Sequence, residues 1–297
     1  MFQIAFARML GPYPIAFHVK SGIPLTLLEE TRELYPDVTY VHELPGDVTE
    51  YEEADLVRDG FRLPEKRDNL FSKSLFQFQS IYNRASCIRD FACPDRIRKI
   101  IDAKYGEALA APLSVGISVR RGDYLAIPHL HPFVGEAYLK RAVGLFDEKA
   151  VYVVCSDDIP WCKGFFSKPC FRKRRFVFVE GEEVLTQLFV HTRCKHNIIS
   201  NSTFSWWGAF LNENADRRVI FPDKWFGITN WRNKNHLVLP EAEIVHCRHS
   251  PAQMALARAL NFRKRTGDLL RSLHLRRPRT GRLPEFFGPA STCGEGK

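Results

Sequence analysis

Two adjacent arginines directly follow a short apolar run in this sequence. The run is Leu113–Val119, and the arginines are Arg120 and Arg121. A guanidinium keeps its charge at any working pH and can hold a diphosphate through two parallel hydrogen bonds. Gly122 then lets the backbone turn closely, and Asp123 can orient an arginine or accept a hydrogen bond from a substrate hydroxyl. The residues alone leave two interpretations open: an anion site at a strand end, or a surface ion pair of small energetic value.

A second apolar run, Val151–Cys155, also ends in polar residues. Ser156, Asp157 and Asp158 follow it. Paired carboxylates at a strand end can bind a metal ion, sugar hydroxyls or the N–H groups of a guanine edge. An aspartate in this place can instead accept the free N–H groups at the start of the next helix, and we expect one of the two to do so.

The third polar strand end lies in the stretch around which the C-terminal half is organised. His196–Ile199 predicts a short buried strand, and the residues from Ser200 to Ser205 are nearly all small and polar. An apolar helix that contains Trp206 and Trp207 follows. The first turn of a helix has free backbone N–H groups, which a serine or threonine can cap and which can also bind an anion such as phosphate.

These three strand ends belong to an alternation of strands and helices that predicts an α/β fold. Apolar strands alternating with helices indicate a parallel sheet covered on both faces. Ligands of such sheets bind at the carboxyl ends of the strands, so the three polar stretches are expected to meet. The predicted strands are 113–119, 151–155, 176–179, 196–200 and 219–221, and the predicted helices are 134–146, 184–194 and 204–212.

The sequence before and after this region is less regular. A helix is predicted over Met1–Leu10 and another over Asp90–Tyr105, with strand candidates at 15–19, 23–28 and 38–41. Ala111-Pro112 marks a domain boundary. The folded pattern fades after Pro240, where we expect a basic helix over 254–275 and then a disordered end.

Charge and composition restrict the classes of partner. The net charge is +9, of which residues 249–297, with ten Lys or Arg against three Asp or Glu, carry +7. The rest of the chain is therefore close to neutral, which argues against nucleic acid as a partner. The basic tail is expected either to be solvated or to make a peripheral contact with a membrane surface.

Cysteine spacing and hydropathy indicate the cellular compartment in which the protein is expected. The eight cysteines show no CxxC pattern, so we expect no zinc site and reduced thiols, with Cys155 and Cys194 buried and inert. No apolar run approaches the ~20 residues that cross a bilayer, and Met1–Leu10 lacks the pattern of a signal peptide. These features predict a cytoplasmic protein.

Four strings resemble, in order, the signatures of one known family. They are SVRRGDY (118–124), SDDIPWCK (156–163), CKHNIISNSTFSWWGAFLN (194–212) and FPDKWF (221–226), with PHLHPFVGEAYLKRA (128–142) as a looser match. The family is the bacterial-type α-1,2-fucosyltransferases, glycosyltransferase family 11, for which FSWWGA is highly specific. The resemblance covers residues 1–239 and is strong from Gly116 onward.

The resemblance implies a GT-B fold, with two Rossmann-like domains facing across a cleft. We expect an N-terminal, acceptor-side domain over 1–110, a GDP-fucose-binding domain over 111–248 and a basic tail over 249–297. It further implies that L-fucose passes from GDP-fucose to a hydroxyl of a glycan acceptor, the 2-OH of galactose being expected. Inversion at the anomeric carbon, no required metal and no further cofactor are also implied, which places the protein in carbohydrate metabolism.

The resemblance also assigns roles to single residues. Arg120 would hold the diphosphate, Arg121 would support it, and Asp123 would orient these groups; Arg120 and Asp123 are the predicted catalytic residues. Trp206 and Trp207 are expected to pack in the core. The predicted donor-binding residues are Arg121, Ser118, Asp157, Asp158, Asn201, Ser202, Thr203, Phe204 and Ser205.

The general base and the activity of this chain stay open. Asp123, His131 and Glu136 are all candidates for the base that deprotonates the acceptor hydroxyl. The segment MFQIAFARML resembles the helix that follows the family's GGLGNQ loop, so we expect a chain that lacks the first strand and that loop. Ser118 stands where the family often has histidine, and Gln187 where an aspartate is expected. The alternative to an active enzyme is a non-catalytic protein that binds a nucleotide sugar or a glycan.

Overall fold

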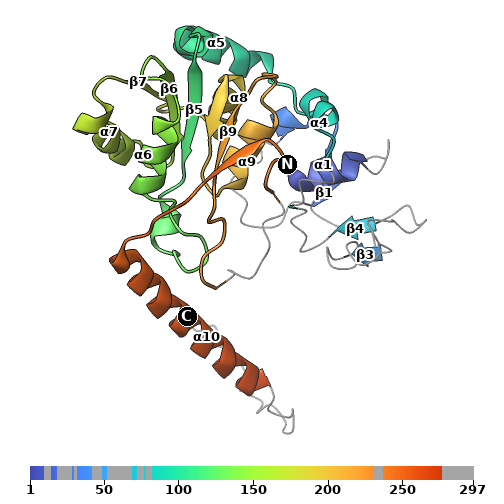
Figure 1. Ribbon diagram of the computed structural model, residues 1–297. Helices are drawn as coiled ribbons and strands as arrows, with labels where there is room; N and C mark the ends of the chain where they lie inside the picture. Colours follow the sequence, from blue (N-terminus) through green and yellow to red (C-terminus); the bar gives the residue numbers. More distant parts are fainter. Residues whose placement is uncertain are drawn as a thin grey trace, which may run out of the picture.

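A six-stranded parallel sheet organises the protein (Figure 1). The computed structural model describes residues 1–9, 15–18, 29, 32–41, 49–51, 69–71, 77, 82–229 and 237–275. The strands are β5 (Ser114–Val119), β6 (Val151–Ser156), β7 (Arg175–Phe178), β8 (His196–Ile198), β9 (Val219–Pro222) and β10 (Ala242–Val245), which lie in the order β10-β9-β8-β5-β6-β7. Every neighbouring pair is parallel.

This strand order reverses between β5 and β8. The chain first winds outward through β6 and β7, then returns to the middle and winds the other way through β8, β9 and β10. That is the doubly wound order of a Rossmann fold, in which ligands bind in the crevice where the winding changes direction. Arg120 leaves the carboxyl end of β5 and Ile199 leaves that of β8, so two of the three polar stretches border this crevice.

Helices cover both faces of the sheet, as the apolar strands require. On one face, Val115 and Ile117 of β5 pack with α6 (Glu136–Gly144) and α7 (Ile159–Phe166). On the other face, Val153 of β6 packs with α5 (Asp95–Ala110), α8 (Val184–Arg193) and α9 (Thr203–Phe210). The predicted α/β class with a parallel sheet between two helical layers is confirmed.

Helix α1 (Phe2–Met9), near the start of the chain, packs on the α9 side of the sheet. It places the Phe2 ring 5.0 Å from the centroid of Trp206 and 4.9 Å from that of Trp207. Both tryptophans are buried, at 0% and 2% exposed, so the prediction that they pack in the core is confirmed. The remaining elements here are the parallel pairs β1 (Ala16–His18) with β2 (Thr39–Val41) and β3 (Thr49–Tyr51) with β4 (Asn69–Phe71), and helix α4 (Arg84–Asp90).

The domain division stays a prediction. Helix α5 belongs to the predicted first domain by sequence, yet it packs against α8 and shares a core with the sheet. A second Rossmann-like domain would involve residues outside those described, and so would the strand predicted at 23–28.

One expectation about the fold is wrong, and several elements of the structure were not predicted. The folded pattern does not fade after Pro240, because β10 adds an edge strand that pairs with β9 from Ala242↔Val219 onward. The basic helix is present as α10 (Pro251–Leu275), which projects away from the body of the protein (Figure 1). The 3-10 turns η2 (Asp123–Leu125) and η3 (Pro169–Phe171) were not predicted, nor was α4, whereas α7 is the helix expected to follow the two aspartates.

The thiols have the character expected of them. The seven cysteines that the described ranges include are free. Burial raises the pKa of Cys155 to about 12 and raises that of Cys194 well above its usual range. Both thiols therefore stay protonated and unreactive at neutral pH.

Candidate functional site at the carboxyl end of the sheet

Asp157 organises the turn that follows β5. Its carboxylate accepts hydrogen bonds from the backbone N–H groups of Arg121 (2.9 Å) and Gly122 (3.1 Å). The same carboxylate lies 3.2 Å from a guanidinium nitrogen of Arg120. A Cβ at Gly122 would come within 2.9 Å of Asp157 Oδ2, so only glycine permits this close approach. One aspartate thus fixes both the backbone turn and an arginine.

Asp158 holds the second arginine and starts the next helix. One oxygen accepts the N–H of Trp161 at 3.2 Å, which caps α7 as expected for one aspartate of the pair. The other oxygen forms an ion pair with Arg121. The guanidinium of Arg121 also lies 4.8 Å from the ring centroid of Trp161 and 5.9 Å from that of Phe133. Arg121 is therefore held between a carboxylate and two aromatic rings, which suits the supporting role that the family resemblance implies.

Arg120 is the more exposed of the two arginines at the end of β5. Its side chain is 41% exposed, against 22% for Arg121. Asp123 lies 3.0 Å from one of its guanidinium nitrogens, Asp157 lies near another, and the Tyr124 ring lies 5.6 Å away. These contacts fix the direction of the side chain while leaving part of the guanidinium open to solvent. An anion in the crevice could pair with it without a further rearrangement.

Asn201 connects the end of β8 to two neighbouring loops. It is 1% exposed, and its Nδ2 donates to the carbonyls of Pro132 and Trp225, both at 3.0 Å. The Tyr124 hydroxyl donates to the backbone carbonyl of Asn201 at 3.0 Å. In the described part of the chain, Asn201 Oδ1 is buried without a hydrogen-bond partner. The predicted donor-binding residue Asn201 therefore positions the walls of the crevice.

The start of α9 lies on the other side of the crevice. Ser202 is the residue before its first turn, and its side chain makes no capping hydrogen bond. The first helical hydrogen bond runs from Trp206 N to Ser202 O at 3.0 Å, so the N–H groups of Thr203, Phe204 and Ser205 belong to the open first turn. Such a turn attracts an anion.

The serines among the predicted donor-binding residues are buried. The Ser205 hydroxyl is fully buried and lies 2.9 Å from Ser200 O and 2.8 Å from Ser202 O, so it bonds within its own turn. Ser118 is 4% exposed at the end of β5. The Ser205 hydroxyl is therefore already used within the segment, whereas the backbone N–H groups of the first turn can donate to a ligand.

The three candidate bases have different surroundings. The His131 ring stacks on Tyr124 with centroids 5.2 Å apart, and burial lowers the pKa of its imidazole despite the carboxylate of Asp123 nearby. A lowered pKa keeps His131 neutral at neutral pH, the form that accepts a proton. Asp123 is paired with Arg120, and Glu136 with Lys168 at 2.7 Å.

The structure adds aromatic residues that the sequence did not single out. Tyr124 touches Arg120, His131 and Asn201. Phe133 and Trp161 enclose Arg121. Tyr124 and Trp161 occur inside the SVRRGDY and SDDIPWCK strings, so the signal was an aromatic residue three positions after each charged pair.

Two kinds of feature are absent from the described ranges. No group of three or more His, Cys, Asp or Glu side chains there is placed to hold a metal ion. No helix within the same ranges combines the length and the hydropathy that a bilayer span requires.

Parts of known proteins are similar in sequence to this chain. In Escherichia coli, the O-antigen biosynthesis glycosyltransferase WbnK is 34% identical over 126 residues, which are 39% of this chain and 40% of that protein. An Escherichia coli alpha-1,2-colitosyltransferase is 32% identical over 47% of this chain and 50% of its own length. The human galactoside alpha-(1,2)-fucosyltransferase 1 is 30% identical over 41% of this chain and 37% of its own. The matched part spans half or less of each of these relatives.

One solved structure and one family model also match this chain. The structure of POFUT1 in complex with GDP-fucose matches with 14% identity over 72% of this chain and 74% of that one, at a TM-score of 0.40, which does not by itself establish a shared fold. The model of the family described as "Glycosyl transferase family 11" matches residues 56–227, more than half of the chain, and this range includes both arginines, both aspartates and the start of α9. The chain therefore belongs to glycosyl transferase family 11.

Proposed function

We propose that this site transfers L-fucose from GDP-fucose to a hydroxyl of a glycan acceptor, the 2-OH of galactose. The observation that carries the proposal is Arg120, a half-exposed guanidinium oriented by two carboxylates at the switch point of a doubly wound sheet. The names of the relatives, an alpha-1,2-colitosyltransferase and galactoside alpha-(1,2)-fucosyltransferases, support the sugar and the linkage.

The proposed reaction is a single displacement at the anomeric carbon. The acceptor oxygen attacks from the face opposite the phosphate, the bond to GDP breaks, and the configuration inverts. Negative charge then grows on the leaving diphosphate. In this proposal Arg120 and the N–H groups at the start of α9 neutralise that charge, and the reaction needs no metal ion. His131, Asp123 or Glu136 takes the proton from the acceptor hydroxyl.

A direct assay tests this function. The chain is incubated with GDP-fucose and methyl β-galactoside, with and without EDTA, and GDP release is followed while the product linkage and anomeric configuration are assigned by NMR. We expect a fucosyl-α-1,2-galactoside and the same rate with EDTA. If GDP-fucose raises the melting temperature but no glycoside forms, the chain is a non-catalytic nucleotide-sugar-binding protein.

The pH dependence of transfer separates the candidate bases. Burial lowers the pKa of His131, so as the pH falls this side chain is still neutral at its ordinary value of about 6.5 and is protonated only below it. If His131 is the base, kcat/KM stays constant from pH 8 to below 6.5 and falls about tenfold per pH unit only once the pH is below the lowered pKa of His131. A His131→Gln variant should lose most of its activity at every pH, whereas Glu136→Gln serves as the control and should keep the native profile. An unchanged profile in His131→Gln would assign the role to a carboxylate.

We also propose that α10 attaches the protein to an anionic membrane surface. Phe262 and Leu269, seven residues apart and therefore on one helix face, are 70% and 60% exposed. Arg258 and Arg265 each precede one of them by four residues and lie beside them on the same face. An apolar stripe bordered by arginines is the pattern of a helix that lies in a lipid headgroup layer.

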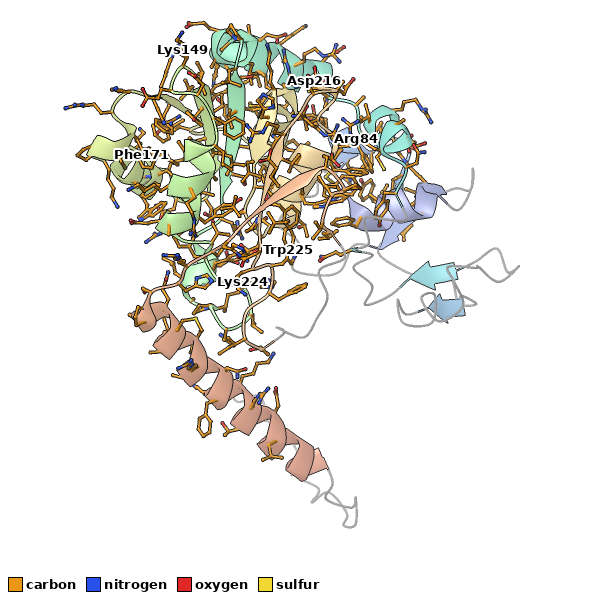
Figure 2. The ribbon with its side chains drawn as sticks, in the orientation of Figure 1. Arg84, Lys149, Phe171, Asp216, Lys224 and Trp225 are labelled. Atoms are coloured by element: carbon orange, nitrogen blue, oxygen red, sulfur yellow. The ribbon has the colours of Figure 1, made fainter. Side chains whose placement is uncertain are left out.

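Vesicle sedimentation tests this attachment. We expect binding to vesicles with 30% phosphatidylserine, weak binding to pure phosphatidylcholine, and loss of most binding in the double variant Phe262→Ser with Leu269→Ser. Lys149→Ser, at an exposed turn far from α10 (Figure 2), is the control. Equal sedimentation of the double variant and the native chain would rule out this surface.

A further inference from the structure

An apolar pocket lies beside the crevice, and its lining residues include none of the predicted donor-binding residues. Its volume is about 280 Å³, and its walls include Tyr124 and Phe133 on one side, Phe226 and Ile228 on a second, and Met254 and Ala257 of α10 on the third. Figure 2 shows Lys224 and Trp225, which flank this second wall, near the end of the sheet from which α10 starts. The polar side chains among its lining residues are few: Lys224, His249, Gln253 and the Tyr124 hydroxyl, which is already bonded to Asn201.

Hydrogen bonds between the three walls hold the pocket open. Gly227 N donates to Leu130 O at 2.7 Å, and Thr229 N donates to His129 O at 2.9 Å. The two backbones approach so closely that a Cβ at Gly227 would lie 2.4 Å from His129 O. The Thr229 hydroxyl donates to Asn261 Oδ1 of α10 at 2.8 Å, which ties the third wall to the second. The pocket is therefore preformed and does not depend on a ligand for its shape.

The pocket shares residues with the crevice. Tyr124 lines it and also lies 5.6 Å from the guanidinium of Arg120. His131, a candidate base, stacks on the same ring. Asn201 binds the carbonyls of Pro132 and Trp225, one from each of two walls. A sugar whose hydroxyl reaches His131 or Asp123 would thus have its next substituent within reach of this pocket.

We infer that the pocket is an acceptor subsite that takes an apolar group attached to the acceptor sugar. This inference rests on the proposed transfer to a glycan hydroxyl. The donor's diphosphate and guanine need many hydrogen bonds, and this lining offers few. An alkyl or aryl group matches an apolar cavity with a small number of polar groups. Helix α10 then has two faces with separate roles, an inner one for the acceptor and an outer one for the membrane.

The test compares two acceptors that differ only in their aglycone, methyl and hexyl β-D-galactopyranoside. Each methylene group that is buried in the pocket favours binding. We therefore expect the KM of the hexyl compound to be at least about tenfold lower than that of the methyl compound. Met254→Asp should abolish this difference and leave KM for GDP-fucose and kcat with the methyl compound unchanged. Ala255→Asp, the exposed neighbour on the same helix, is the matched control and should keep the preference.

Calorimetry of galactoside binding in the absence of GDP-fucose tests the pocket separately from the proposed transfer reaction. If no transfer occurs but the hexyl compound binds more tightly than the methyl one and Met254→Asp removes the difference, the pocket is supported and the transfer is not. Ile228→Asp, on another wall, replaces Met254→Asp if that variant does not fold. Equal affinity for both galactosides in the native chain, or a loss of GDP affinity in the pocket variants, would overturn the inference.

Discussion

Replacing Arg120 by alanine is expected to lower kcat for fucose transfer by about a thousandfold while the fold stays intact. The guanidinium is 41% exposed and supports no core packing, so the melting temperature should hardly change. The proposed function of this guanidinium is to stabilise the negative charge that develops on the diphosphate as the glycosyl bond breaks. A donor group that acts on developing charge contributes more in the transition state than in the ground state, so kcat should fall more than KM rises.

Two further arginine variants make this result specific. Arg120→Lys keeps the charge but loses the planar pair of N–H donors, so it should recover only part of the rate. Arg175→Ala removes an arginine with 55% exposure at the opposite end of the strands and should leave kcat unchanged. Native kcat in Arg120→Ala would remove Arg120 from the reaction and shift the proposal to the helix start alone.

The sequence alone predicts that these groups lie at one edge of the sheet, but it does not predict which of them pair with each other. Apolar runs and the polar residues after them predicted three strand ends on one side of a parallel sheet. The pairing of Arg120 with Asp157 depends on β5 and β6 being neighbours, with Val119 opposite Ser156, so that the next residue of each strand is brought together. Register between separate strands is set by the whole sheet, and neither the SVRRGDY nor the SDDIPWCK string contains that information.

The same limit explains what the sequence did not predict. Strand β10 is four residues long and reads as loop, and only its pairing with β9 makes it a strand. The family resemblance placed Ser205 among the donor-binding residues, but the turn geometry directs its hydroxyl to carbonyls of its own segment. The apolar pocket joins three segments that are up to about 130 residues apart in sequence, from Tyr124 to Ala257, and no local pattern predicts their meeting.

Trp206→Ala should produce the largest loss of stability of any single substitution considered for this chain. Trp206 is fully buried, and its ring lies 4.5 Å from that of Phe210 and 5.0 Å from that of Phe2. Its indole N–H donates to Leu237 O at 2.6 Å. Removing a buried aromatic side chain of this size costs about 3–5 kcal/mol, because the surrounding groups cannot close the cavity. A native protein has only about 5–15 kcal/mol to lose, so the variant should be near the limit of folding.

Urea denaturation measures this loss, and two variants calibrate it. Trp206→Phe keeps most of the ring volume but loses the hydrogen bond, so it should be destabilised less than the alanine variant. Phe262→Ala removes an aromatic ring that is 70% exposed and should change the free energy of unfolding by no more than about 0.5 kcal/mol. Because Trp206 lies between α1 and the sheet while the first turn of α9 borders the crevice, loosening the tryptophan should also weaken GDP-fucose binding in the fraction that remains folded. If Trp206→Ala were no less stable than Phe262→Ala, the aromatic cluster could not be what fixes α9 beside the site.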